Sequence, residues 1–268
     1  PDIPSVNTST LCFMDDTTLI SSNCDGLNHM LSIAQEFYDL NNTKINFNKA
    51  TLICNRSPDN IHEPLGSSPL AHTFKVDSTR EFTITPISPS DSFRFLGVWF
   101  TLSMSPTTVK KQCKTEYALF ASTLRRKRLT IDQLRYLHNS VLIPRIEYRL
   151  KATLLTERDC WSIMAPFKKV FKNIARVTRS LPDGFLHSRD ALNIMDIFAR
   201  HLSNHVGMFT KSMDSDSILK DIMDIRLANL QSSLCLPFSP LILEIDEFDI
   251  FKFTKQFRHD LIFIFLLN

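Results

Sequence analysis

The chain has 268 residues, of which 43% are hydrophobic, and carries a formal net charge of +3. This length allows one large domain or two ordinary ones, and the apolar fraction is sufficient for a sizeable core. Only 5 residues are glycine, and neither GxGxxG nor GxxxxGKS/T occurs, which argues against a Gly-rich phosphate-binding loop. The 6 cysteines lack any CxxC spacing and no signal peptide is visible, so we expect reduced thiols in an intracellular protein, nuclear or cytoplasmic.

Two short segments rich in β-formers, residues 10–14 and 17–21, flank a pair of adjacent aspartates, Asp15 and Asp16. This pattern predicts a β-hairpin that carries both carboxylates at its tip. A helix capped by Asn23 or Asp25 is expected to follow from about Gly26. Its apolar face is predicted at positions one helical turn apart, namely Leu27, Leu31, Ala34 and Tyr38.

The rest of the first third is predicted to be mainly β. Residues 45–54 indicate a turn that leads into a strand, and residues 72–85 and 93–101 are β-like. Between them, residues 55–70 contain three prolines and few apolar residues, which is typical of a surface loop.

From Ser105 the pattern becomes helical, so the predicted fold class is α+β. A first helix is indicated by apolar residues three and four apart, namely Val109, Cys113, Tyr117, Phe120 and Leu124. Thr130 and Gln133 form a T-x-x-Q capping box for a second helix, which Pro144 is expected to close or kink. A third helix contains Pro166, where we expect a kink or a restart, and residues 188–234 predict further helices.

Charge is segregated along the chain. Residues 1–103 carry a net charge of −5, residues 104–180 of +12 and residues 181–268 of −4. A strongly basic block between two acidic ones indicates a polyanionic partner. Ordinary solvated helix faces are the alternative interpretation.

The aspartate pair could bind metal ions. Mg²⁺ prefers hard oxygen ligands in octahedral geometry, and two-metal phosphoryl transfer places two ions about 4 Å apart over the reacting phosphate. At least one further carboxylate is needed to bridge the two metals. On the dipeptide alone, an acidic turn without a ligand remains the alternative.

The segment "LCFMDDTTLIS" (11–21) resembles the FxDD or YxDD hairpin of reverse transcriptases, especially those of non-LTR (LINE-type) retrotransposons. A helix follows, and then three segments resemble later elements of that family in the same order. They are the LxxNxxKS/T element, the YLG strand under the primer and a thumb segment, matched by "KINFNKAT" (44–51), "FRFLGVWFT" (93–101) and "LHNSVLIPRIEYRL" (137–150). The resemblance implies an RNA-directed DNA polymerase that uses two Mg²⁺ ions, dNTPs, an RNA template and a DNA primer. It places a partial palm in residues 1–103, a basic thumb in 104–180 and a helical extension of unknown role in 181–268.

Residue by residue, the resemblance assigns the metal ligands to Asp15 and Asp16. It makes Lys49 a candidate proton donor to the leaving pyrophosphate, with a solvated turn lysine as the alternative. It aligns Phe95, Leu96 and Gly97 with the strand that supports the primer. The alternative for Gly97 is a simple β-bulge.

Several cations of the basic block are candidate phosphate contacts for template and primer. On the first helix, Lys111, Lys114 and Arg125 are expected opposite the apolar face. On the third, a ridge of Lys168, Lys172 and Arg179 is expected opposite Phe167 and Phe171. Four consecutive cations close the first helix, namely Arg125, Arg126, Lys127 and Arg128.

The metal site predicted from the resemblance is incomplete. Only 14 residues precede Asp15, and the only acid among them is Asp2, so we expect the upstream aspartate strand and the fingers to be absent and this polypeptide alone not to polymerise DNA. Two alternatives remain open: a non-catalytic nucleic-acid-binding module, and a helical interaction protein whose aspartates only form a turn. The i, i+4 pair His201 and His205 lacks an HExxH glutamate and is not expected to bind metal. The apolar run 261–267 is too short to span a membrane, which needs about 20 residues.

Overall fold

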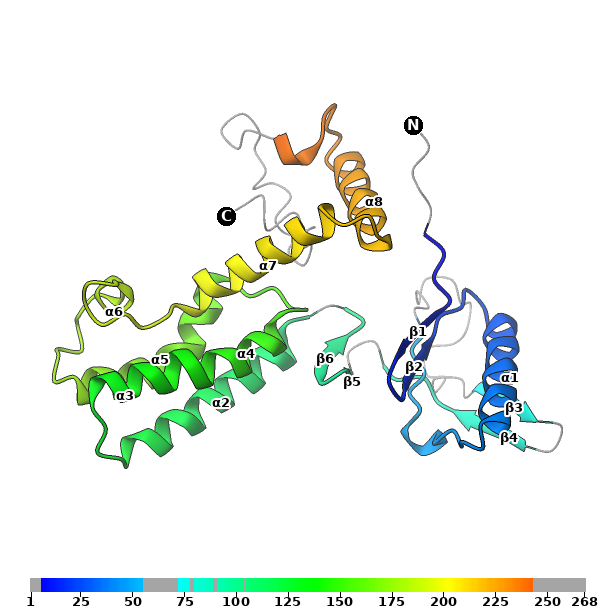
Figure 1. Ribbon diagram of the computed structural model, residues 1–268, viewed down its shortest axis with the longest axis horizontal. Helices are drawn as coiled ribbons and strands as arrows, with labels where there is room; N and C mark the ends of the chain where they lie inside the picture. The colour runs from blue at the N-terminus through cyan, green and yellow to red at the C-terminus, as the bar shows by residue number, and fades with distance from the viewer. Residues whose placement is uncertain (1–5, 55–71, 78–79, 89–90, 104, 243–268) are drawn as a thin grey trace, which may run out of the picture. The chain divides into compact units, whose positions relative to one another are not determined.

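The computed structural model describes residues 6–54, 72–77, 80–88, 91–103 and 105–242 (Figure 1). The chain forms two compact units, one mainly from residues 7–96 and the other mainly from residues 104–242, and each is described by itself. Small antiparallel hairpins come first and a helical region follows, so the α+β class is confirmed. The apolar run 261–267 and the whole of the predicted loop 55–70 lie outside the described residues.

The N-terminal unit begins with the predicted hairpin. Strand β1 (Thr10–Phe13) pairs antiparallel with β2 (Asp16–Leu19), and the register places Phe13 opposite Asp16. Helix α1 (Cys24–Leu40) follows, and the side chain of Asn23 caps it by accepting from the amide of Gly26 at 2.7 Å. Such a cap satisfies one of the amides that a helix start leaves without a partner.

Further hairpins complete the β part of the chain. Strand β3 (His72–Asp77) pairs with β4 (Arg80–Ile84), and α1 packs on β3 and β2. The prediction for residues 45–54 was wrong in part, because the chain forms a short 3₁₀ helix, Phe47–Lys49, and then no regular strand. The segment 93–101 is not one strand but a hairpin of β5 (Ser92–Phe95) and β6 (Val98–Thr101).

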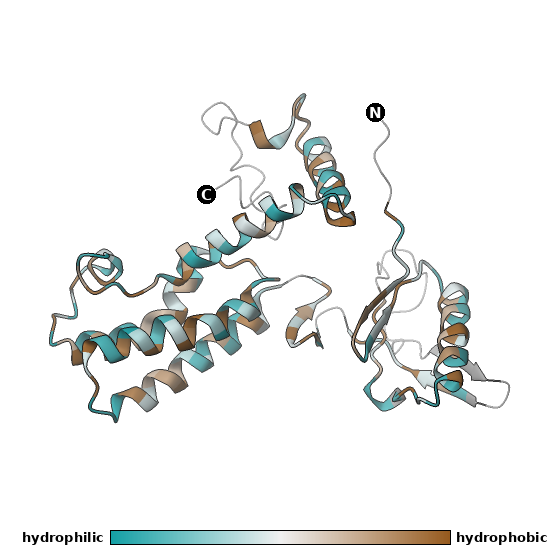
Figure 2. Ribbon diagram, viewed as in Figure 1, coloured by the Kyte–Doolittle hydropathy of each residue, from teal (hydrophilic) through white to brown (hydrophobic). Residues whose placement is uncertain are grey.

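The second unit is helical, and its helices carry both hydrophobic and hydrophilic residues (Figure 2). The predicted capping box at Thr130 and Gln133 is present. Within the described residues, no helix combines the length and the apolar character that crossing a membrane requires. The elements in chain order are α2 (Thr107–Arg125), α3 (Ile131–Tyr136), a π-helical segment (Leu137–Leu142), α4 (Ile143–Leu150), α5 (Glu157–Ile174), α6 (Asp183–His187), α7 (Ile197–Met213), α8 (Ile218–Ser233) and a 3₁₀ helix (Pro240–Ile242).

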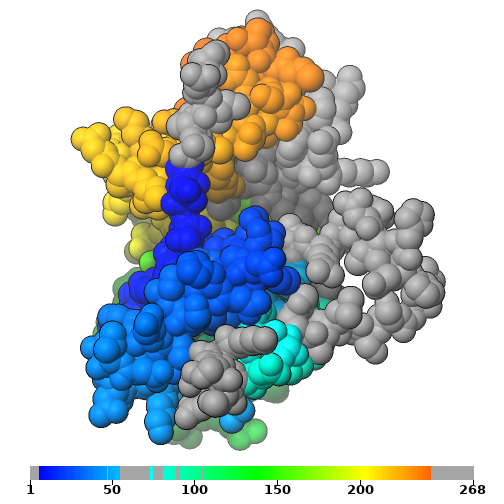
Figure 3. Space-filling view, turned by 90° about the vertical axis from the view of Figure 1, so that its right-hand side faces the viewer, coloured from blue at the N-terminus to red at the C-terminus, as the bar shows by residue number. Residues whose placement is uncertain are grey.

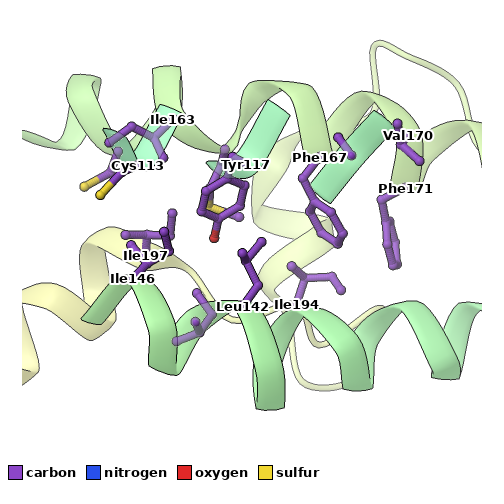
Figure 4. Close-up of a cluster of buried hydrophobic side chains, with 14 of the residues drawn as sticks. Cys113, Tyr117, Leu142, Ile146, Ile163, Phe167, Val170, Phe171, Ile194 and Ile197 are labelled. Atoms are coloured by element: carbon purple, nitrogen blue, oxygen red, sulfur yellow. The ribbon is translucent and has the colours of Figure 1, made fainter. Parts of the chain in front are cut away.

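The core of this unit lies between α2, α4 and α5, where Tyr117, Phe167 and Phe171 are fully buried (Figure 4). The rings of Tyr117 and Phe167 meet edge to face, with centroids 6.5 Å apart. Edge-to-face contact suits the charge distribution of aromatic rings. The helical spacing read from the sequence therefore identified the buried faces of α2 and α5.

The helix continues past each of the two prolines. Pro144 lies in the first turn of α4, and the π-helical segment leads into it from α3 without a break in the helix. Proline cannot donate a backbone hydrogen bond, and a local widening of the helix is a common way to accommodate such a defect. Pro166 lies inside α5, which continues to Ile174 without a restart.

Candidate functional site

The tip of the first hairpin is a two-residue turn of Met14 and Asp15. Met14 has a φ of 54°, in the left-handed region that residues other than glycine rarely adopt. Such conformations are strained and are concentrated at functional sites. The tight turn holds Asp15 and Asp16 at the end of a paired ladder.

The register defines the surroundings of Asp16. The hydroxyl groups of Thr17 and Tyr38 are 2.9 Å apart, so α1 contacts the strand face that carries Thr17, although Thr17 itself stays exposed. Side chains alternate between the faces of a strand. Asp16 therefore lies on the opposite face, with its cross-strand neighbour Phe13, which is 54% exposed.

Both carboxylates are exposed, and their oxygens are the ligand type that Mg²⁺ prefers. Within the described residues, however, no group of three or more His, Cys, Asp or Glu side chains is placed to hold a metal ion. The pair Asp15 and Asp16 therefore fits Mg²⁺ in ligand chemistry but is too small a set for a two-metal site. Without a cation, adjacent carboxylates also repel each other.

The other palm candidates are described by their local surroundings. Lys49 ends the 3₁₀ helix with an exposed side chain, and its ammonium has no ion pair in the described part of the chain. Leu96 and Gly97, just after Phe95, form the turn of the β5–β6 hairpin, with φ angles of 46° and 81°. Two successive left-handed residues make the hairpin turn that glycine favours. The β-bulge interpretation of Gly97 was therefore wrong.

The basic face expected on α2 is present. Lys111, Lys114 and Arg125 are exposed, while the residues of the predicted apolar face are buried or packed against the core. Lys114 donates to the hydroxyl of Ser162 on α5 at 3.4 Å. The following cations Arg126, Lys127 and Arg128 are also exposed.

The basic ridge predicted on α5 does not form, because two of its three members are buried. Lys168 and Lys172 are each only 8% exposed, and both ammonium groups donate to Asp183, at 2.8 Å and 3.3 Å. Lys172 also donates to the carbonyl oxygens of Leu181 and Arg179. Successive helical residues are about 100° apart, so these lysines flank Phe167 and Phe171 rather than lying opposite them. Neither is available to a phosphate, whereas the side chain of Arg179 is exposed.

Ion pairs occupy further cations of the helical unit. Lys110 pairs with Asp159, Arg145 and Arg149 pair with Glu116, and Arg200 pairs with Glu147. The net charge of +12 already subtracts these three acids, so the pairs do not lower it but show which cations are engaged within the unit.

The structure also shows an exposed row on α5 that the sequence reading missed. Arg158, Trp161, Ala165 and Lys169 are all exposed and recur at spacings of 3, 4 and 4 residues. That helical spacing was visible in the sequence. The apolar spacing identified the buried face of α5, but the expected basic ridge followed Lys168 and Lys172, which border that face, and so missed the outward row.

The two histidines of α7 pack against each other. The His201 and His205 rings meet edge to face at 4.4 Å, beside a hollow of about 10 Å³ between α4 and α7. The Nε2 atom of His201 accepts from the amide of Leu155 at 3.3 Å, so its lone pair is already used. Burial, with a smaller contribution from His205, lowers the pKa of His201 to about 3.

Comparison of the chain with protein-family models, with curated proteins and with solved structures returned no match.

Proposed function

We propose that the chain is part of an RNA-directed DNA polymerase of the non-LTR retrotransposon type. In this proposal the first hairpin is the half of the catalytic site that carries Asp15 and Asp16, and the basic helical unit is the thumb. The observation that carries the proposal is the geometry of the hairpin tip. Two exposed carboxylates follow a left-handed residue at the end of an antiparallel pair.

Asp15 and Asp16 would hold Mg²⁺, which supplies Lewis-acid activation and charge neutralisation for phosphoryl transfer. The chain's own contribution is positional. A paired hairpin with α1 packed on one face limits the movement of both carboxylates. Because the described residues bring no third carboxylate to the pair, we infer that this polypeptide does not polymerise DNA alone.

Metal binding at the hairpin tests the proposal. Paramagnetic Mn²⁺ should broaden the amide resonances of residues 13–17 first, and Mg²⁺ should compete with it. Asp15→Asn and Asp16→Asn should each weaken this broadening, because each removes one of two adjacent anionic ligands. Asp91→Asn is a matched control, since Asp91 is an exposed aspartate elsewhere in the same unit. Equal broadening around Asp91 and the pair would overturn the assignment of a metal site.

A non-catalytic nucleic-acid-binding module is the second candidate. It is favoured by the exposed cations on and after α2, from Lys111 and Lys114 to the run Arg125–Arg128. The test is fluorescence anisotropy with an RNA–DNA duplex at several salt concentrations, because phosphate contacts weaken as salt rises. Asp15→Asn should leave this binding intact. No duplex binding even at low salt would favour the third alternative, a helical interaction protein.

A further inference from the structure

The outward face of α5 combines a large aromatic ring with exposed cations. The opposite face of this helix is buried through Ile163, Phe167 and Phe171. Trp161 points away from that core and is 49% exposed, whereas Trp99, the other tryptophan, packs against the core cluster. A tryptophan that could bury its ring but leaves half of it in water is a candidate contact for a planar ligand.

The cations around Trp161 keep their charge available. Arg158 and Lys169 are exposed on the same face of α5 and have no ion pair within the described residues. Arg176, just after the helix, is exposed as well. At about 1.5 Å per residue, Arg158 and Lys169 are roughly 16 Å apart along the helix, with Trp161 between them.

The neighbouring helix widens this basic surface. Lys110 pairs with Asp159, and Lys114 donates to Ser162, so α2 runs alongside the first turns of α5. Lys114 therefore borders the row that contains Arg158. Acids on α5 are confined to its first turn, where Lys110 already pairs with Asp159, and Glu157 has no ion pair within the described residues.

We propose that this surface binds single-stranded nucleic acid, with a base stacked on Trp161 and phosphates held by Arg158, Lys169 and Lys114. A single strand leaves its bases free to stack on an aromatic side chain, and such stacking tolerates any base sequence. A duplex keeps its bases stacked on one another, so a ring on the flank of a helix would gain no partner. The inference rests on the proposed function, which supplies the ligand class, a nucleic acid. It adds that the ligand is single-stranded and names the residues that bind it.

The test is binding of a fluorescein-labelled oligo-dT about twelve nucleotides long, and of its duplex with oligo-dA, to the whole chain. Trp161→Ala should weaken single-strand binding by roughly 5- to 150-fold. Replacing both Arg158 and Lys169 by Gln should lower the salt slope by roughly 1.4. In Trp99→Phe, which retains Trp161 as the sole tryptophan, the oligo-dT should quench the remaining fluorescence.

Controls keep the outcome specific. Tyr136→Ala removes an exposed aromatic ring from another helix and should leave oligo-dT binding unchanged. Circular dichroism should show that Trp161→Ala, a surface change, retains the native fold. Duplex binding that equals single-strand binding and is insensitive to Trp161→Ala would overturn this inference while leaving the proposed function standing. Equal binding of polyglutamate would also overturn it, and binding of neither nucleic acid would count against both proposals.

Discussion

The ammonium of Lys172 lies 3.3 Å from a carboxylate oxygen of Asp183, beneath the loop that joins α5 to α6. The same ammonium donates to the carbonyl of Leu181 at 2.6 Å, and Lys168 donates to the other oxygen of Asp183. Two cations that looked like a phosphate-binding ridge in the sequence thus fix a loop inside their own unit. The positive surface of the protein has to be located on other residues of α2 and α5.

Asp183→Asn should lower the free energy of unfolding, because it leaves two mostly buried ammonium groups without their anion. Loss of one partner of a buried pair costs about 3–5 kcal/mol. The Asp183 side chain is 44% exposed, so solvent screening should reduce the loss to roughly 1–2 kcal/mol. Urea denaturation measures this, with the exposed Asp190→Asn as the control. Equal stabilities of the two variants would contradict the role given to Asp183.

The ion pairs of Asp183 should lower the pKa of its carboxyl group. Burial by itself would raise the pKa of Asp183, but the hydrogen bonds and charge of Lys168 and Lys172 outweigh burial and lower it. A lowered pKa in the folded state means that the stabilisation is present at neutral pH and is lost as pH falls through that pKa. Carbon-detected NMR of the Asp183 carboxyl should therefore give a midpoint below its ordinary value of 3.8.

Stability should also fall in mild acid because of His138. This ring is fully buried, stacks on Phe167 with centroids 4.4 Å apart and shares a hydrogen bond of 3.1 Å with the hydroxyl of Tyr117. Burial lowers the pKa of His138 to about 4, although a hydrogen bond to Asn139 raises it in part. The neutral ring therefore supports the fold fully above pH 6.5, and that support is lost as pH falls from 6.5 towards 4.

The loss from His138 should approach about 1.4 kcal/mol per pH unit in that window. Buried His201, with a pKa of about 3, adds to it in the same direction. Urea denaturation at several pH values measures the slope. His29→Gln should leave the slope unchanged, since His29 is exposed. Constant stability across the window would show that the buried rings accept protons in the folded state.

Polymerase activity is expected to be absent from the purified chain. With Mg²⁺, dNTPs, an RNA template and a DNA primer, we expect no primer extension, because Asp15 and Asp16 lack a third carboxylate in the described residues. Denaturing gel electrophoresis of a labelled primer provides the measurement. Extension that requires Mg²⁺ and disappears in Asp15→Asn would prove this expectation wrong and would show that the pair is catalytic as it stands.

The cysteines should separate into two classes of reactivity. Cys12, Cys24 and Cys235 are exposed, whereas Cys113 and Cys160 are fully buried in the helical core. Burial raises the pKa of each of the two buried thiols to about 12, so little reactive thiolate forms at neutral pH. A thiol reagent should therefore modify Cys12, Cys24 and Cys235 in the native protein. It should reach Cys113 and Cys160 only after the protein is unfolded in urea. Rapid native modification of the buried pair would indicate local opening between α2 and α5.

The sequence by itself determined the features that depend on neighbouring residues. Segments rich in β-formers around Asp15 and Asp16 were enough for the hairpin, and the capping box at Thr130 was predicted correctly. The cap of α1 was predicted as Asn23 or Asp25, and it is Asn23. Apolar spacing of three and four residues also identified the buried face of α2. Hairpin turns, caps and amphipathic faces arise from contacts within a few residues, so local pattern suffices for them.

Only the tertiary structure decided which charges remain free. Lys168 and Lys172 are drawn inward because Asp183 and two loop carbonyls, seven or more residues away along the chain, provide hydrogen-bond partners for their ammonium groups. The same packing turns Arg158, Trp161 and Lys169 outward on α5. A charge count along the sequence cannot distinguish these two groups, because burial and pairing depend on residues that only folding brings together. The candidate binding face therefore lies on a different side of α5 from the basic ridge that the sequence predicted.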